Sequence, residues 1–110
     1  MKLIIAIVQD EDAARLVSAL MERGYGVTKL ATTGGFLRAG NTTLISGVED
    51  EKLQDALGII EHICKSREQI TAHTAPMSGG AGGVYVPYPI KVTVGGATVF
   101  VLEVSQFLKV

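Results

Sequence analysis

Three β-branched stretches of the chain carry apolar residues at neighbouring positions rather than only at alternate ones. They are KLIIAIV at 2–8, TTLISGV at 42–48 and ATVFVLEV at 97–104. Successive side chains of a strand point to opposite faces of its sheet, so a sheet built from these stretches is apolar on both faces. The fold therefore has to cover both faces, either with its own helices or with another molecule.

Two amphipathic helices are predicted, each with an acidic start. Asp10 is expected to cap the first, Glu11 and Asp12 suit the positive end of its dipole, and Gly24 is placed to end it. Residues 49–51 supply the same chemistry to the second. Apolar residues repeat at helical spacing at Ala13, Leu16, Val17, Leu20 and Met21, and again at Leu53, Ala56, Leu57, Ile60, Ile63 and Cys64.

The remaining segments are predicted as strands and loops. Residues 27–33 and 42–48 are expected to pair antiparallel around a glycine-containing loop at 34–41. Residues 65–89, which contain SGGAGG, lose all periodicity and are predicted to be a long loop, and a loop of this length is normally either functional or disordered. Residues 90–94 and 97–104 are predicted to form a hairpin that turns at Gly95-Gly96.

The resulting order is βαββαβ with an extra C-terminal strand, in a single domain spanning residues 1–110. This order predicts an α+β, ferredoxin-like sandwich in which two helices cover one face of an antiparallel sheet. The other face stays bare, so we expect self-association, most economically as a closed ring.

Composition excludes several classes of protein. The chain is 47% hydrophobic and 19% charged with a net charge of −1, which argues against a disordered chain and against a protein that coats nucleic acid. The N-terminal apolar run is too short for a signal peptide or a membrane span, and Cys64 is the single cysteine, so we expect a soluble, cytoplasmic protein. His62 and His73 stand without clustered ligands, and no nucleophile is paired with a base, so neither a metal site nor an enzyme is expected.

The stretch ATTGGFLRAGNTT at 31–43 is either an ordinary loop or a ligand site. Taken alone, Gly and Asn are what turns require. However, the backbone at Gly34 and Gly35 can approach a phosphate closely, Phe36 can stack on a base, and the Asn41 amide can pair with an adenine edge. SGGAGG at 78–83 lacks the ending of a phosphate-binding P-loop and favours a flexible loop.

The segments KLATTGGFLRAGNTT, REQ at 67–69, PYP at 87–89 and GGATVFV at 95–101, together with IIAIVQD near the start, resemble the P-II-like cyclic di-AMP receptor proteins of Gram-positive and related bacteria. The resemblance covers nearly the whole chain. It implies a homotrimer of ferredoxin-like subunits, with one cyclic di-AMP bound between each pair of neighbours, and no catalysis. It also implies two mobile loops, at about 34–41 and 66–88, that respond to the ligand and contact an unknown downstream protein.

The resemblance also implies a set of ligand contacts. Two roles remain open for Arg38: it either pairs with a phosphate of the ligand or is an ordinary solvated residue of the loop. Where relatives often carry Asn and Arg, this chain has Gly24, Tyr25 and Gly26, so two contacts are expected to be missing. The positions that match ligand contacts of the family are Thr28, Gly35, Phe36, Leu37, Asn41, Gly47 and Phe100.

The expected function is therefore that of a cyclic di-AMP sensor, with neither a nucleic-acid polymer as partner nor insertion into a membrane. The alternative is a P-II-type regulator that binds ATP, ADP or another nucleotide and acts by inserting a loop into a partner protein.

Overall fold

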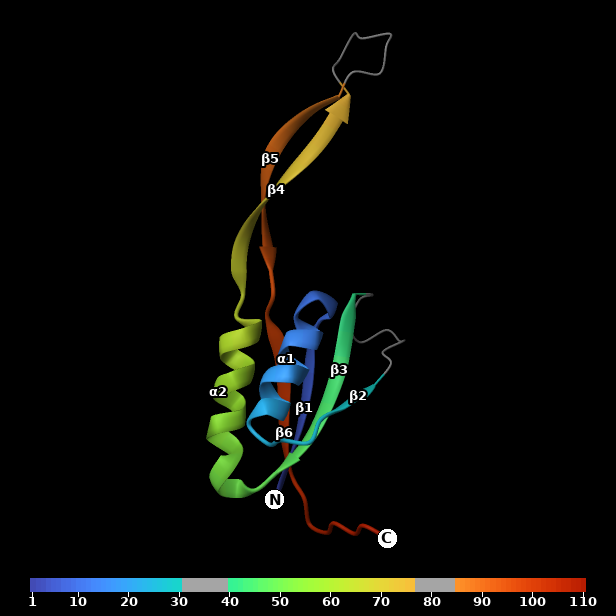
Figure 1. The fold of residues 1–110 in the computed structure, drawn as a ribbon, viewed down its shortest axis with the longest axis vertical. Coiled ribbons are helices and arrows are strands. Elements are labelled where there is room, and N and C mark those ends of the chain that lie inside the picture. Colours follow the sequence, from blue (N-terminus) through green and yellow to red (C-terminus); the bar gives the residue numbers. More distant parts are fainter. Residues whose placement is uncertain (31–39, 77–84) are drawn as a thin grey trace.

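A computed structural model describes the backbone of residues 1–30, 40–76 and 85–110, and the side chains of the same residues except 71–76 and 85–88. A body of helices and one sheet carries a long ribbon of two strands at one end (Figure 1). The elements along the chain are β1 (Lys2–Gln9), α1 (Asp10–Glu22), β2 (Thr28–Leu30), β3 (Asn41–Val48), the 3-10 turn η1 (Asp50–Lys52), α2 (Leu53–Cys64), β4 (Arg67–Pro76), β5 (Tyr85–Val94) and β6 (Ala97–Glu103).

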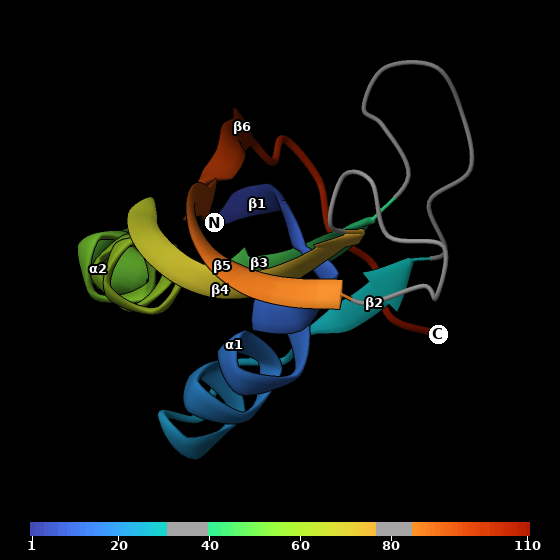
Figure 2. The same cartoon turned by 90° about the horizontal axis from the view of Figure 1, so that it is seen from above.

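The main sheet has four antiparallel strands in the order β2-β3-β1-β6. Helices α1 and α2 lie on the same face of this sheet (Figures 1 and 2). This arrangement confirms the predicted α+β class and is consistent with a ferredoxin-like sandwich. The predicted first strand, both helices and the antiparallel pairing of β2 with β3 are confirmed as well.

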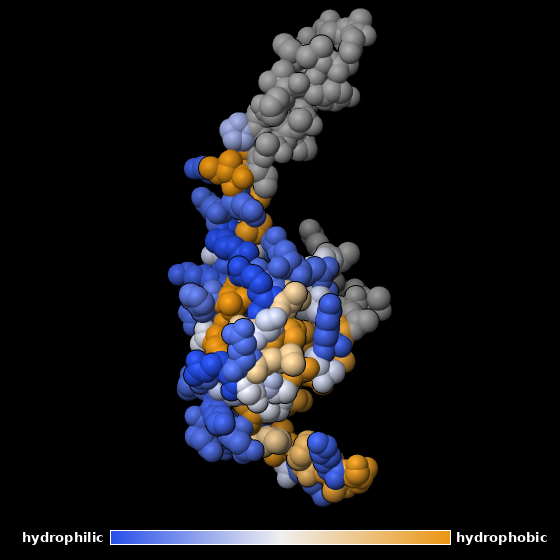
Figure 3. Space-filling model, in the orientation of Figure 1, coloured by the Kyte–Doolittle hydropathy of each residue, from blue (hydrophilic) through white to orange (hydrophobic). Residues whose placement is uncertain are grey.

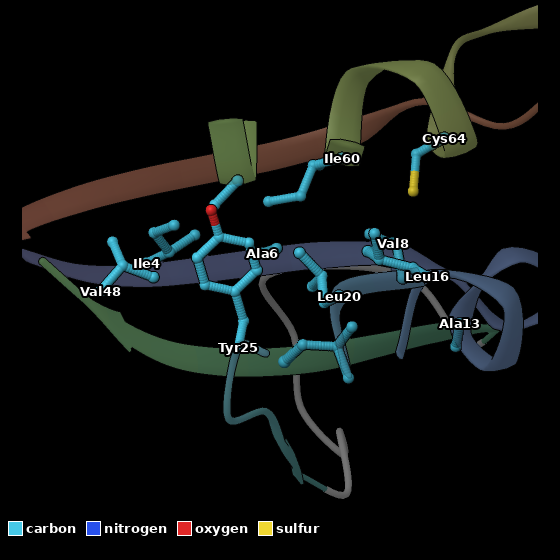
Figure 4. Packing of buried hydrophobic residues seen from close by; sticks show 12 residues of the cluster. Ile4, Ala6, Val8, Ala13, Leu16, Leu20, Tyr25, Val48, Ile60 and Cys64 are labelled. Atoms are coloured by element: carbon cyan, nitrogen blue, oxygen red, sulfur yellow. The ribbon is translucent and has the colours of Figure 1, made fainter. Parts of the chain in front are cut away.

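The hydrophobic core fills the space between the helices and one face of the sheet. Ile4, Ala6 and Val8 alternate along β1 and point toward the helices, where Leu16 and Ile60 pack against the same cluster (Figure 4). Val8 and Leu16 are completely buried. Burial of one such side chain stabilises a fold by roughly 1.5–3 kcal/mol, so this face of the sheet accounts for much of the stability of the body.

The start of α1 differs from its prediction. Gln9 occupies the N-cap position, and no side chain caps the helix. Asp10 instead lies inside the first turn, where its backbone N–H donates to the carbonyl of Gly40 at 2.8 Å and its carboxylate accepts a hydrogen bond from the Thr42 hydroxyl. Asp10 therefore ties the helix to the start of β3 rather than closing its own helix end.

The end of α1 follows its prediction except at one residue. Gly24 has a φ of +86° and donates its N–H to the Met21 carbonyl, as expected of a glycine that ends a helix. Met21 was expected to face the sheet, but its side chain is 60% exposed. Leu20 fills the core position of that turn instead.

The prediction of a long loop over residues 65–89 was wrong. Residues 67–76 and 85–94 form the antiparallel strands β4 and β5, which pair with each other from Arg67 opposite Val94 to Pro76 opposite Tyr85. The prolines in β5 argued against a strand, but each strand of a two-stranded ribbon is an edge, where a missing N–H is tolerated. The predicted loop segment at 77–84 lies outside the described residues.

The predicted hairpin of residues 90–94 with 97–104 was also wrong. β5 pairs with β4, whereas β6 pairs with β1 in the main sheet. Gly95 and Gly96, with φ values of +84° and +92°, carry the chain from one sheet to the other. The last strand is thus the fourth strand of the main sheet, and the addition to the βαββαβ order is the β4-β5 hairpin before it.

Among the described glycines, Gly95 leaves the least room for a Cβ. A Cβ built there would lie 2.6 Å from Arg67 Nη1, 2.7 Å from the Lys65 carbonyl oxygen and 3.1 Å from the Cys64 carbonyl oxygen. Gly96 has a similar φ, but a Cβ there would meet nothing within 4 Å. The two glycines therefore separate the cost of backbone conformation from the cost of steric collision.

We predict that Gly95→Ala lowers the free energy of unfolding by clearly more than Gly96→Ala does. Both variants incur the cost of a strained φ, about 1–3 kcal/mol, and only Gly95→Ala adds a collision with backbone oxygen atoms. Urea unfolding followed by circular dichroism measures both values. An equal loss of unfolding free energy in the two variants would show that a Cβ at Gly95 causes no steric collision.

Candidate ligand-binding face

The face of the main sheet turned away from the helices carries a row of apolar side chains. The register of β1 with its two neighbours places Leu3 beside Gly47 and Leu102, and Ile5 beside Ile45 and Phe100. Residues paired across antiparallel strands share a face, so these residues lie together. We call this surface the open face; it comprises Thr28 and Leu30 of β2, Asn41, Thr43, Ile45 and Gly47 of β3, Leu3, Ile5, Ile7 and Gln9 of β1, and Thr98, Phe100 and Leu102 of β6.

The open face is only partly shielded. Phe100 is 45% exposed and Leu102 is 46% exposed, although both lie within strand β6 rather than at a loop tip. None of the open-face residues named above carries a charge. A phosphate on this face would therefore have to be met by hydroxyls, amides or backbone N–H groups, or by a charge from outside the strands.

Every predicted ligand residue that the structure describes lies on the open face. Thr28, Ile45, Ile5 and Phe100 form a single row across all four strands. At a strand spacing of about 4.8 Å, Thr28 and Phe100 stand roughly 14 Å apart at the two edges of the sheet. The other predicted residues, Gly35, Phe36, Leu37 and Arg38, lie outside the described residues.

Asn41 and Gly47 mark the two ends of β3 on the open face. They are six positions apart, which corresponds to about 20 Å along an antiparallel strand. Gly47 leaves the surface open, since a Cβ built there would meet only the tip of Met1, at 3.9 Å. A flat group can thus approach the backbone at this end.

The Asn41 end of the open face is hollowed. A cavity of about 240 Å³ there is lined by Ile7, Gln9, Asn41, Thr98 and the Gly95–Gly96 crossing, with Ala97. Sequence reasoning missed Gln9 and the glycine crossing as parts of this end, because the register that brings β1, β3 and β6 together at this point is set by long-range pairing. A polar residue that closes an apolar strand, as Gln9 does, is the only local signal.

The segment before Thr28 places its side chains away from the open face or has none. Tyr25 is 8% exposed, and its hydroxyl donates to the Asp55 carboxylate on α2, which raises the pKa of the tyrosine. The carbonyl of Gly26 accepts a hydrogen bond from the Ser46 hydroxyl at 2.7 Å, and a Cβ at Gly26 would meet nothing within 4 Å. The space next to Gly26 is therefore available for a larger side chain.

A second hollow of about 300 Å³ lies on the helix side, between α2 and the edge strand β6. Its lining includes Ile60, Cys64 and Val99, with Glu61 and Lys65 of opposite charge at its rim. Burial raises the pKa of the Cys64 thiol to about 11, so this thiol is protonated at neutral pH and is a poor nucleophile. The arrangement favours neither a phosphate site nor covalent chemistry in this hollow.

No group of three His, Cys, Asp or Glu side chains able to hold a metal ion occurs among the described residues. In the same part of the chain, no helix is long and apolar enough to cross a membrane.

Figure 3 shows hydrophilic residues over much of the face that it displays and apolar residues at the C-terminal tail, where Phe107 and Leu108 are exposed.

Comparison with known proteins agrees with the geometry. A solved structure described as a functionally unknown protein from Pediococcus pentosaceus ATCC 25745 is similar to this chain, with a TM-score of 0.79 and 45% sequence identity over 99% of this chain and 96% of that one. The family described as cyclic-di-AMP receptor matches residues 1–110. The chain therefore belongs to the cyclic-di-AMP receptor family.

Proposed function

We propose that the protein is a cyclic di-AMP sensor that binds its ligand on the open face of the sheet. The observation that carries the proposal is that Thr28, Asn41, Gly47 and Phe100 all lie on one uncharged, partly apolar face, in a chain of this receptor family. Cyclic di-AMP has two flat bases, two phosphates and an adenine edge to be read. Phe100 offers a stacking surface, Thr28 a hydroxyl and Asn41 an amide for these parts.

The spacing of these residues supports a site shared between copies of the chain. Asn41 and Gly47 lie about 20 Å apart along β3, which is long for the span of one cyclic dinucleotide. If each end contacts a different ligand, the Asn41 end of one copy and the Gly47 end of the next together surround one molecule. A closed ring completes every such site and covers the apolar face, and a homotrimer is the ring that we propose.

The proposed output is a change in the segments next to the site. The responding segments in this proposal are 34–41, which ends at the first residue of β3, and 66–88, which includes β4 and the start of β5, and both contact an unknown protein partner. A ligand shifts such segments only by as much as it favours one of their states. The proposed location is the cytoplasm.

We predict that cyclic di-AMP binds with measurable heat and that Asn41→Ala and Phe100→Ala each weaken the binding by about tenfold or more. Loss of base stacking or of an amide contact is worth about 1–3 kcal/mol. Met21→Ala is the control, because Met21 is also an exposed apolar residue, 60% against 45% for Phe100, but lies on the helix side. Isothermal titration calorimetry measures the affinities, and analytical ultracentrifugation checks that assembly is unchanged.

Several outcomes would count against this site. Wild-type affinity in both variants would place the ligand elsewhere on the molecule. Heat with ATP or ADP but none with cyclic di-AMP would favour the alternative, a P-II-type regulator that responds to another nucleotide. Because Asn41 is a polar residue at the end of β3, whereas Phe100 is an exposed apolar residue on the edge strand β6, Asn41→Ala still tests the site if Phe100→Ala disturbs assembly.

We also predict that Gly26→Arg tightens the binding of cyclic di-AMP by about tenfold. A charge-assisted hydrogen bond to a phosphate contributes about 1.5–3 kcal/mol, and a Cβ at Gly26 meets nothing within 4 Å. Gly26→Ala controls for the loss of backbone freedom. Calorimetry at two salt concentrations should show the gain for the arginine alone, and larger at low salt; an unchanged or weaker affinity would mean that this segment does not face the phosphates.

A further inference from the structure

The position of the β4-β5 hairpin depends on contacts at its base, where the two strands join the body. Within the part of the chain that the structure describes, β4 and β5 pair only with each other and form a sheet separate from the main one. The ribbon leaves the body at one end (Figure 1). A two-stranded ribbon is marginally stable by itself, so contacts at its base decide how it is held.

One strand of the hairpin is held by an ion pair with a buried carboxylate. Arg67, the first residue of β4, donates from Nη2 to Asp12 Oδ1 at 2.9 Å and from Nη1 to Oδ2 at 3.4 Å. The Asp12 side chain is only 1% exposed, and Arg15 approaches it at 3.8 Å. A buried carboxylate requires such partners, so the body holds Arg67 in place; the same guanidinium also donates to the Lys65 carbonyl at 3.1 Å.

The other strand is held from the same turn of the body. The N–H of Gly95, directly after β5, donates to Gln9 Oε1 at 2.7 Å. The N–H of Gly96 donates to the Cys64 carbonyl at the end of α2. Gln9 and Asp12 stand three positions apart in the chain, so one short segment holds both strands of the hairpin.

Residues 9–12 also contact β3, the strand that begins at Asn41. Asp10 binds the Gly40 carbonyl through its N–H at 2.8 Å and the Thr42 hydroxyl through its carboxylate. Gln9 lies opposite Asn41 in the register of β1 with β3. Residues 9–12 therefore contact both the Asn41 end of the open face and the root of the hairpin.

We infer that residues 9–12 form a junction that couples ligand binding at the Asn41 end of the open face to the β4-β5 hairpin, with Arg67 as the positioning residue of the hairpin. The inference rests on the proposed function. Its two states are a hairpin anchored through Asp12 and Gln9 and a hairpin released from them. A ligand that contacts Asn41 favours the anchored state if that state fixes β3 and the junction in the geometry that it binds.

The test is amide hydrogen exchange of the full chain with and without saturating cyclic di-AMP. In the wild-type protein, the ligand should slow exchange in 68–75 and 86–94 severalfold. Arg67→Met should remove most of this protection, whereas Arg23→Met should retain it. Arg23 is the matched control, because it donates to Asp55 at 2.7 Å as a similar Arg-Asp pair that is not part of the junction.

Arg67→Lys is the second variant, in case loss of the charge beside buried Asp12 perturbs the fold. Lysine keeps a charge for Asp12 but lacks the planar fork that also reaches the Lys65 carbonyl, so part of the protection should return. Full ligand-induced protection in Arg67→Met, or equal loss of protection in Arg23→Met, would overturn the junction.

A ligand-free comparison separates this inference from the proposed function. In the free protein, Arg67→Met should speed exchange both in β5 and at residues 40–42, because the junction holds both, while Arg23→Met leaves them unchanged. Unchanged exchange at 40–42 in Arg67→Met would overturn the junction whatever the ligand. Absence of heat when wild-type protein is titrated with cyclic di-AMP would instead overturn the proposed function and leave this comparison in force.

Discussion

The packing of two helices against only one face of a four-stranded sheet is the constraint on which the rest of the structure depends. It buries Ile4, Ala6 and Val8 and leaves Ile5 and Phe100 on the opposite face. Apolar surface of this kind in the middle of a sheet marks a place where another molecule binds. The residues proposed to contact the ligand, where the structure describes them, lie on this same face, so the covering molecule and the ligand are parts of one proposal.

The buried carboxylate of Asp12 links the body to the hairpin. Burial of a carboxylate is costly without a cationic partner, and the nearer cation beside Asp12 is Arg67, at 2.9 Å, against 3.8 Å for Arg15. Arg67 lies at the base of a hairpin whose two strands otherwise pair only with each other among the described residues. The acidic start of α1 therefore does more than complement the helix dipole. It connects the body to the ribbon, next to the strand that begins at Asn41.

Much of the body could be predicted from sequence, because periodicity is a local signal. The helix stripes around Leu16 and Ile60 and the strand at 2–8 were recognised in this way. The prediction of a loop at 65–89 was wrong for a physical reason. Prolines and glycines argue against a central strand, but they are compatible with an isolated two-stranded ribbon. The prediction of a hairpin turn at Gly95-Gly96 was wrong because a glycine pair has the same sequence signal whether it joins two paired strands or carries the chain between two sheets. The resemblance placed Thr28 and Phe100 in one site, but only the register showed them in one row.

The central claim is that one copy of the chain supplies only part of each site, since the residues proposed to contact the ligand lie at opposite ends and edges of the open face. Native mass spectrometry of the full chain titrated with cyclic di-AMP tests this claim most directly. The account predicts trimers that carry up to three ligands and no ligand-bound monomer. Monomers that each carry one cyclic di-AMP would contradict it, because a single open face would then be a complete site.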